Sequence, residues 1–453
     1  MRRSLLLTVA AALAASGSAV YIASSAAAAE ACAAAWSSSA VYTKDMTASQ
    51  SGHNYTAKWW TQNESPATHS GQWDVWADNG ACGGTTPSPS PSTPPSTPPS
   101  TPPSTPPIPV TGLPKHALIG YLHASFANGS GYVRMADVPA DWDIINLAFG
   151  EPTSATSGDI RFTLCPPSEC GGVESEADFI AAIRAKRAAG KKVLLSIGGA
   201  NGQVQLTTTG ARDKFVSSVS AIIDKYGLDG VDIDFEGHSL SLNTGDTDFK
   251  NPTTPVIVNL IAALRSLKAR YGAGFVLTMA PETFFVQLGY QYYGSGPWGG
   301  QDPRAGSYLP VIYAMRNDLT VLHVQDYNSG SIMGLDNQWH SMGGADFHIA
   351  MTDMLLAGFP VAGNTANMFP ALREDQVAFG APSSVSAGNG YVAPAGVQQA
   401  VTCLVKGTNC GGYAVRSGTN PNFRGLMTWS INWDKFYGWE FRNSHEPFLN
   451  ALG

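Results

Sequence analysis

The chain has 453 residues, of which 43% are hydrophobic and 10% aromatic, so it has enough apolar side chains for a sizeable core and is not a disordered chain. Its formal net charge is -7. This acidic balance argues against nucleic acid or an anionic membrane as the main partner, because both are bound by basic surfaces. The length also exceeds what one ordinary domain needs.

Residues 1–29 have the features of a secretory signal peptide. Arg2 and Arg3 precede an apolar run from Leu5 to Ala15, and small residues follow up to Ala29. Export removes such a segment, and we expect cleavage near Ala29. An uncleaved membrane anchor is the alternative, but the run is short for a membrane span of about 20 residues. We therefore expect a secreted, extracellular protein without a membrane partner.

Residues 30–84 form a first body that is rich in aromatic residues. Its short alternating segments are typical of a small β fold. Residues 85–111 follow and consist almost wholly of proline, serine and threonine, with repeated S-T-P-P. Because this segment has few apolar side chains to bury, we expect an extended, polyproline-like linker between the first body and residues 112–453.

Six cysteines are present, an even number that is compatible with disulfides in an exported protein. The sequence alone leaves fifteen pairings open. Proximity along the chain favours Cys165–Cys170 and Cys403–Cys410, and Cys32 with Cys82 would then close the first body. No C-x2-C spacing occurs, which disfavours a zinc site, and we expect neither a metal nor a cofactor.

Residues 112–453 alternate short β-prone runs with helical stretches, which predicts an α/β fold, a (β/α)8 TIM barrel. The expected strands are His116–Leu122, Asp143–Phe149, Lys192–Ile197, Gly230–Phe235, Phe275–Met279, Val321–Gln325, Gln376–Phe379 and Gly425–Trp429. Ala177–Ala189 and Arg212–Tyr226 carry apolar residues at helical spacing. A doubly wound sheet is the weaker alternative, because no G-x-G-x-x-G turn follows the first strand.

An acidic row, D-G-V-D-I-D-F-E from Asp229 to Glu236, is the strongest functional signal. Residues two apart in a strand share a face, so Asp232, Asp234 and Glu236 point to one side. Like charges in a low dielectric cannot all stay ionised, and a protonated Glu236 would donate to a leaving oxygen at neutral pH. A calcium site is disfavoured, because oxygens on one strand rarely surround a cation. A solvated edge strand is disfavoured by the apolar residues in between.

The D-x-x-D-x-D-x-E motif resembles the signature of family 18 glycoside hydrolases, the chitinases and their relatives. Lys192–Gly199, Met279–Glu282, Gln325–Asn328 and Trp429 resemble further motifs of that family, in the same order. The resemblance covers Ala117 to the C-terminus. It implies hydrolysis of β-1,4 linkages between N-acetylglucosamine units in chitin, with retention of configuration by substrate-assisted catalysis.

The resemblance also implies a role for each matching residue. Glu236 would protonate the glycosidic oxygen and later activate water, while Asp234 would orient the substrate acetamide and Asp232 would tune Asp234. Tyr327 would donate its hydroxyl to the acetamido oxygen. The residues expected to bind the substrate are Gln325, Asn328, Trp429, Met279 and Glu282. Core packing is the alternative for the tryptophan, and an indirect contact through other side chains is the alternative for the last glutamate.

The first body carries a second resemblance. Tyr55–Gln62 reads Y-T-A-K-W-W-T-Q and resembles the core of small chitin-binding modules of carbohydrate-binding families 5 and 12. An exposed aromatic pair offers a flat apolar area that suits a crystalline sugar face. We expect Trp59 and Trp60 to bind chitin, with Tyr42 as a weaker candidate.

The segment 382–424 is too short for the extra α+β insertion that deepens the cleft in some relatives, which favours endo action on chitin and chitooligosaccharides. Three other functions are open: an endoglycosidase acting on N-glycans, a non-catalytic chitin-binding lectin and a cellulase. The chitin-type module disfavours the first, Glu236 disfavours the second, and a cellulase gives no role to Asp234 and Tyr327. We expect a monomer.

Overall fold

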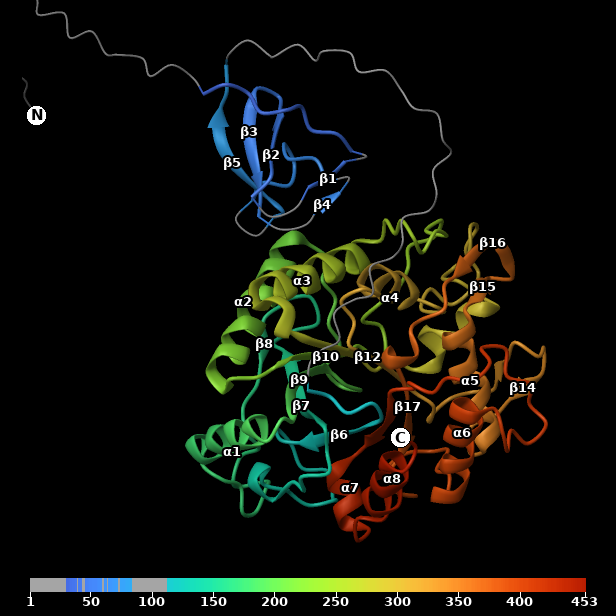
Figure 1. Cartoon of the computed structure of the whole chain (residues 1–453). Coiled ribbons are helices and arrows are strands. Elements are labelled where there is room, and N and C mark those ends of the chain that lie inside the picture. The colour runs from blue at the N-terminus through green and yellow to red at the C-terminus, as the bar shows by residue number, and fades with distance from the viewer. Residues whose placement is uncertain are drawn as a thin grey trace, which may run out of the picture. The chain divides into compact units, whose positions relative to one another are not determined.

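The computed structural model describes residues 30–83, apart from 39, 43–44, 59–60, 63 and 72–73, and residues 112–453. The chain divides into two compact units, one N-terminal and one C-terminal (Figure 1). The expected signal peptide (residues 1–29) and linker (residues 85–111) lie outside the described residues, as do Trp59 and Trp60.

The N-terminal unit is a small all-β structure. Its strands are β1 (Val41–Tyr42), β2 (Thr47–Gln50), β3 (His53–Ala57), β4 (Thr61–Gln62) and β5 (Trp76–Ala81). The second, third and fifth form an antiparallel sheet, and the first pairs with the fourth. Tyr42, Tyr55 and Trp76 are buried in a small apolar core. The Cys32–Cys82 disulfide ties the beginning of this unit to its end.

The C-terminal unit is a closed barrel of eight parallel strands, as predicted. They are β6 (Ala117–His123), β7 (Ile144–Pro152), β9 (Lys192–Gly198), β10 (Gly230–Asp234), β11 (Val276–Met279), β12 (Val321–Gln325), β17 (Val377–Pro382) and β18 (Gly425–Trp429). Each strand pairs with the next, and the last pairs with the first, which closes the ring. A two-residue strand, β8 (Ile160–Arg161), extends β7 in antiparallel fashion.

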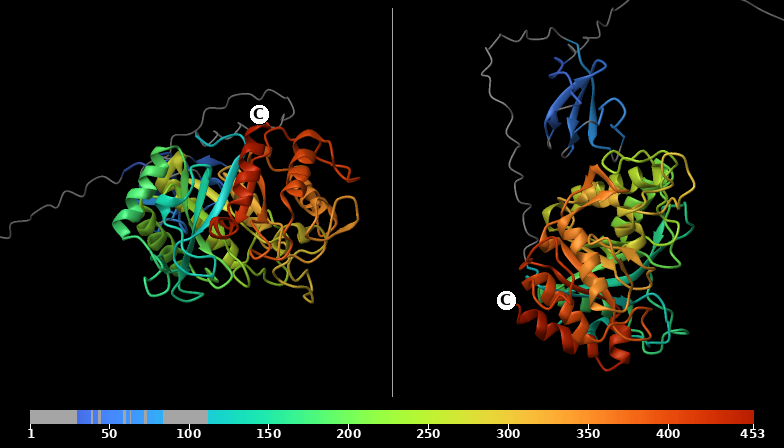
Figure 2. Two further views of the ribbon diagram at one scale, coloured as in Figure 1. Left: turned by 90° about the horizontal axis from the view of Figure 1, so that it is seen from below. Right: turned by 90° about the vertical axis from the view of Figure 1, so that its right-hand side faces the viewer.

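Helices surround the barrel (Figures 1 and 2). They are α1 (Glu176–Ala188), α2 (Thr209–Tyr226), α3 (Pro255–Tyr271), α4 (Leu309–Met315), α5 (Ala345–Ala357), α6 (Pro394–Lys406), α7 (Ile431–Phe436) and α8 (Glu440–Asn450). Both helices predicted from periodicity are confirmed. The side chains of Ser175 and Thr208 cap the first two, and Gly227 ends the second with a φ of 68°.

Short elements complete the C-terminal unit. They are the hairpin strands β13 (Ile332–Met333), β14 (Trp339–His340), β15 (Phe359–Val361) and β16 (Asn364–Phe369), and the 3-10 helices η1 (Met135–Asp137), η2 (Gly272–Gly274), η3 (Thr283–Phe285), η4 (Gln287–Tyr290) and η5 (Glu374–Gln376). Residues 383–424, all of which are described, contain only α6 and no strand, so the α+β insertion is absent there.

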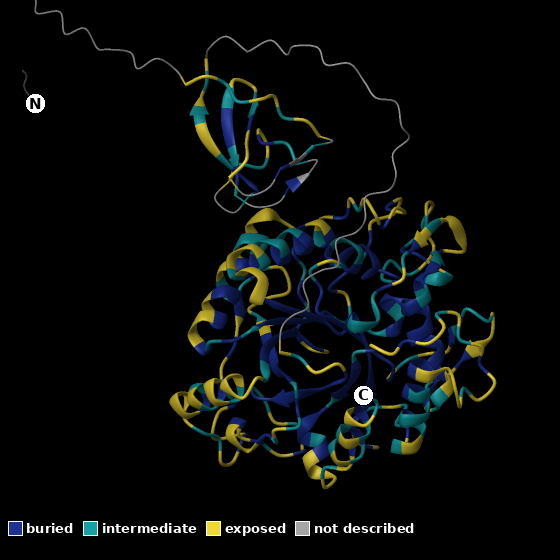
Figure 3. Ribbon diagram, viewed as in Figure 1, coloured by how far each residue is buried: buried dark blue, intermediate teal, exposed yellow. Residues whose placement is uncertain are grey.

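Successive residues of each barrel strand face opposite sides, which separates two apolar layers. On β11, Leu277 and Met279 face outward and join the large core beneath the helices, while Val276 faces the barrel interior. Figure 3 shows the strands buried and the helices exposed on their outer faces. The interior holds fewer apolar side chains and several buried polar ones, which are described below.

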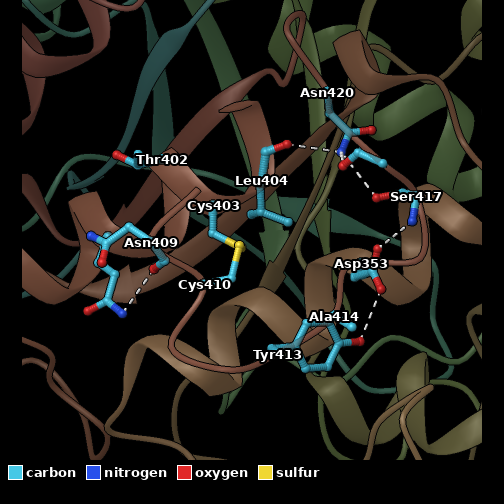
Figure 4. The surroundings of a disulfide bond; sticks show 12 residues. Asp353, Thr402, Cys403, Leu404, Asn409, Cys410, Tyr413, Ala414, Ser417 and Asn420 are labelled. Atoms are coloured by element: carbon cyan, nitrogen blue, oxygen red, sulfur yellow. Dashed lines mark hydrogen bonds between the residues drawn. A yellow bond between two sulfur atoms is a disulfide. The ribbon is translucent and has the colours of Figure 1, made fainter. Parts of the chain in front are cut away.

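All three predicted disulfides are confirmed, namely Cys32–Cys82, Cys165–Cys170 and Cys403–Cys410. The last joins α6 to the loop that follows it (Figure 4). In the same region, the Asp353 carboxylate accepts hydrogen bonds from the Tyr413 hydroxyl and from the backbone N–H groups of Arg416 and Ser417. Among the described residues, no helix combines the length and the apolar character needed to cross a membrane.

Candidate active site

The carboxyl ends of the barrel strands surround a cavity of about 630 Å³, which is the end of such barrels where active sites lie. Seven of the residues predicted from the sequence line it, namely Asp234, Glu236, Glu282, Gln325, Tyr327, Asn328 and Trp429. They come from the ends of four strands, β10, β11, β12 and β18, or from the residues that directly follow them. The barrel therefore brings together segments that are far apart in the sequence.

Asp232 lies beneath the cavity, fully buried in the barrel interior. Its Oδ2 accepts hydrogen bonds from the hydroxyls of Tyr121 at 2.7 Å and Ser196 at 2.8 Å, and its Oδ1 accepts one from Thr278 at 2.6 Å. The register of β10 explains this, because it places Asp232 opposite both Ser196 and Thr278. Three hydroxyl donors satisfy a buried carboxylate, and such bonds to a charged acceptor are strong.

Asp234 and Glu236 follow on the same face and share a hydrogen-bond donor. The Nε2 atom of Gln325 lies 2.9 Å from Oδ1 of Asp234, 3.0 Å from Oε1 of Glu236 and 2.9 Å from the carbonyl oxygen of Ala280. Burial raises the pKa of Asp234 well above its usual range, and the charges of Glu236 and Asp232 add to this effect. The raised pKa favours the protonated form of Asp234, and in that form its carboxyl group is able to donate a hydrogen bond to Glu236.

Burial also raises the pKa of Glu236, although the hydrogen bonds from Gln325 and Asp234 oppose the rise. Glu282, which follows β11, adds a third carboxyl group to the cavity wall. Burial raises the pKa of Glu282 to about 7, the charge of Glu236 contributes, and Arg304 opposes the shift. The cavity thus holds several carboxyl groups whose pKa values are all raised, which favours their protonated forms, as a general acid requires.

An aromatic floor lies beside these carboxyl groups. Trp429, half-buried, is nearly parallel to Phe149 and Phe126, with interplanar angles of 8° and 10° and centroid distances of 5.6 and 6.3 Å. The Tyr121 ring contacts Trp429 at 5.7 Å. Tyr327 is buried, and burial together with the neighbouring carboxylates raises the pKa of its hydroxyl far above the usual range. The site therefore offers flat apolar faces and a phenol that stays a donor.

Two glycines at the end of β9 allow close packing around the floor. Gly198 has a φ of 115°, and a Cβ there would lie 2.2 Å from the carbonyl oxygen of Asp234. Gly199 has a φ of 75°, and a Cβ there would lie 2.6 Å from the Phe149 ring. Both positions require glycine for backbone conformation and for space.

Asn328 lies at the exposed rim of the cavity with a φ of 49°. Its Oδ1 accepts a hydrogen bond from the backbone N–H of Asn389 at 2.8 Å, and its own N–H donates to the Asn389 carbonyl at 2.9 Å. The asparagine thus fixes the loop after β17 against the end of β12.

The structure corrects the expected role of Met279. This residue is fully buried in the core beneath the helices and does not line the cavity. Its neighbour Thr278 points inward to Asp232, and successive strand residues face opposite sides, so Met279 points outward. The prediction that it binds substrate is wrong.

Tyr42 requires a similar correction in the N-terminal unit. Only 7% of it is exposed, its ring meets the edge of Trp76 at 5.0 Å, and its hydroxyl accepts a hydrogen bond from the Ser37 N–H. Tyr42 therefore belongs to the core of the unit and not to a sugar-binding surface. Trp59 and Trp60, the stronger candidates, lie outside the described residues.

Sequence reasoning missed several residues of the site, of which four support the catalytic row or the floor. Tyr121 and Thr278 hold Asp232, and Phe126 and Phe149 extend the floor formed by Trp429. Tyr121 and Phe149 lie near the carboxyl ends of predicted strands. Because active sites of such barrels lie at that end, this position was a signal by which both residues could have been found.

Comparisons with known proteins agree with this geometry. Residues 111–309 match the model of "Glycosyl hydrolases family 18". Exochitinase 1 of Streptomyces olivaceoviridis is 74% identical over 337 residues, which are 74% of this chain and 56% of that protein. A probable class II chitinase of Arthroderma benhamiae is 69% identical over 318 residues, 70% of this chain and 95% of the relative. A solved family GH18 chitinase from Chromobacterium violaceum, 36% identical, superposes with a TM-score of 0.66 and covers 92% of this chain and 99% of its own.

Proposed function

The chain belongs to family 18 of the glycosyl hydrolases, and we propose on that basis that it is a chitinase, which hydrolyses β-1,4 linkages between N-acetylglucosamine units of chitin and chitooligosaccharides. The observation that carries the proposal is the row of Asp232 and Asp234 on β10 and Glu236 just after it, which leads from the barrel interior into an aromatic-floored cavity. The names of the two curated relatives reported above, an exochitinase and a probable class II chitinase, support it.

In the proposed mechanism, Glu236 is the general acid. Glu236, whose pKa is raised by burial, donates its proton to the glycosidic oxygen as the bond from that oxygen to the anomeric carbon breaks. The substrate's own acetamido oxygen attacks the anomeric carbon, so the enzyme needs no second carboxylate as nucleophile. Glu236, now ionised, accepts a proton from water as the water oxygen attacks the same carbon and the bond from that carbon to the acetamido oxygen breaks, which restores the original configuration.

The neighbouring side chains position the acetamide. Asp234 accepts its N–H, and the hydroxyl of Tyr327 donates to its oxygen. Asp232 holds a fixed place under Asp234, because three hydroxyls bind it, and its charge favours retention of a proton on Asp234. Gln325 holds the carboxyl groups of Asp234 and Glu236 near each other, because its side-chain nitrogen donates hydrogen bonds to both. Trp429 supports the apolar face of the reacting sugar.

We propose endo action on the polymer. The absence of a sheet insertion in residues 383–424 leaves this side of the cavity without an added wall, which supports cleavage within a chain. The name of Exochitinase 1 favours the opposite mode. Viscosity of a soluble chitin derivative distinguishes the two, because endo cleavage lowers viscosity at a small fraction of bonds broken, whereas exo cleavage does not.

The chemistry is tested with colloidal chitin and a soluble chitin hexamer, wild type and Glu236→Gln, with product anomers followed by NMR. We expect β-anomers first from the wild type, and a rate at least about 10²-fold lower for the variant. Glutamine keeps the shape and the oxygen that accepts from Gln325, so the variant should still bind the hexamer. Initial α-anomers would contradict substrate assistance. An inert wild type that binds chitin would favour a lectin.

We further propose that residues 30–84 are a chitin-binding module, joined by the linker 85–111 to the catalytic barrel 112–453, and that the protein is exported. The motif Y-T-A-K-W-W-T-Q supports the first part, and the signal-like residues 1–29 with three disulfides support the second. Retention of Trp59→Ala and Trp60→Ala variants on crystalline chitin tests the module. Unchanged retention of the double variant would exclude this pair.

A further inference from the structure

A cluster of aromatic side chains is exposed at the end of α7. Phe436 is 59% exposed and Tyr437 is 41% exposed. Their ring centroids lie 5.4 Å apart, and that of Phe436 lies 5.6 Å from that of Trp433. We call these three residues the rim cluster. Large aromatic side chains gathered on a surface mark a binding site more often than isolated ones do.

The rim cluster is joined to the catalytic cavity on two sides. Along the chain, Ser430 caps α7 and directly follows Trp429, the main residue of the aromatic floor. Across the surface, the Tyr437 hydroxyl lies 2.6 Å from the hydroxyl of Ser386, and the next residue, Ala387, lines the cavity. The rim cluster therefore continues the cavity wall on the side of β17 and β18.

The backbone beneath the rim cluster is firmly held. The Asn432 side chain accepts a hydrogen bond from the His123 N–H at 2.9 Å, and the buried Asp434 carboxylate accepts from the N–H groups of Phe441 and Arg442. Phe436 contributes little to this core because most of its side chain is exposed. Its exposure on a fixed helix has no structural benefit, whereas it suits a surface that binds a ligand.

We propose that the rim cluster binds N-acetylglucosamine units of a chitin chain where the chain leaves the cavity beyond Trp429. The C–H faces of pyranose rings pack on aromatic rings, and the Phe436 ring offers such a face. The hydroxyls of Tyr437, whose ring contacts Phe436, and of Ser386 offer polar partners for sugar hydroxyls. This inference rests on the proposed chitinase function.

The test uses the full chain and soluble chitooligosaccharides of two to six units, because soluble substrates avoid retention by the N-terminal module on solid chitin. Phe436→Ala should lower kcat/KM for the hexamer about threefold to tenfold and leave the shortest cleaved oligomer unchanged. Phe436→Trp keeps an aromatic ring at this position and should retain the wild-type dependence of kcat/KM on substrate length. Trp339→Ala is the matched control, because Trp339 is also aromatic and 57% exposed but lies on the β13–β14 hairpin and does not line the cavity.

Three results would overturn the inference. An unchanged dependence on length in Phe436→Ala means that no sugar unit contacts the rim cluster. An equal loss for short and long substrates means that Phe436 acts through the structure of the site. A concentration-dependent dimer of the wild type that Phe436→Ala abolishes means that a second copy covers these rings. A wild type that cleaves no oligomer rejects the proposed function itself, which is a separate outcome.

Discussion

Tyr121→Phe tests whether the hydroxyl groups around Asp232 hold the catalytic row in place. The substitution removes one of three hydroxyl donors to this buried carboxylate and keeps the ring that contacts Trp429. A hydrogen bond to a charged group contributes about 1.5–3 kcal/mol, so we expect the free energy of unfolding to fall by that amount. For a barrel of about 340 residues, the unfolding entropy near the midpoint is about 0.7 kcal/mol per kelvin, which translates to a Tm lower by about 2–4 °C.

The assay is calorimetry of the barrel transition together with kcat on the chitin hexamer. Tyr226→Phe is the matched control, because this buried tyrosine also donates its hydroxyl to a carboxylate, Glu176, but one whose side chain is 48% exposed, and the expected loss is at most about 1 kcal/mol. We expect kcat of Tyr121→Phe to fall about tenfold, since the charge beneath Asp234 is less firmly fixed. Equal Tm shifts for the two variants, or an unchanged kcat, would refute the reasoning.

Three other outcomes follow from the same geometry. Glu282→Gln removes a carboxyl group whose pKa is raised by burial from 4.5 to about 7. The wild type should lose stability as pH rises through that interval, because the folded state resists ionisation of this group. Denaturant titrations at several pH values should show that the free energy of unfolding of the variant depends less on pH. Trp429→Ala should lower kcat/KM for the hexamer by about tenfold or more, and a loss below twofold would exclude it as the floor of the reacting sugar. Cys82→Ser opens a disulfide between cysteines 50 positions apart and should destabilise the N-terminal unit by about 4 kcal/mol, so that chitin retention falls while hexamer hydrolysis is unchanged.

The barrel strands were predictable because each is a short run of apolar residues buried on both faces. Val321–Gln325 and Gly425–Trp429 match the predicted bounds. The end of β7 was not predictable, since Glu151 and Pro152 extend the strand by pairing with the two-residue strand β8. So short a strand leaves no periodic signal, and only its partner defines it.

Within the site, the sequence predicted what lies on one strand better than what lies between strands. The period of two predicts that Asp232, Asp234 and Glu236 share a face; in the structure Asp232 and Asp234 lie on β10, and Glu236, two residues after its end, lines the cavity with Asp234. The bonds from Tyr121 and Thr278 depend on the register of strands far apart in the sequence, which no local pattern encodes. Met279 was misassigned because the M-A-P-E motif lies beside the site, while its side chain points to the other face.

The two glycines at the end of β9 have a consequence for how variants of this barrel are interpreted. Gly198 and Gly199 carry no side chain that could transfer a proton, yet the backbone of Asp234 and the ring of Phe149 occupy the space that any Cβ would need. In a saturation library, these positions should therefore tolerate substitution as poorly as the carboxylates do. A screen by activity alone would classify both glycines as catalytic residues. Loss of folded yield separates the two groups, because substitutions at the glycines should reduce soluble protein, whereas Glu236→Gln should not. Recombination between related barrels should for the same reason exchange β9 and β10 as one block.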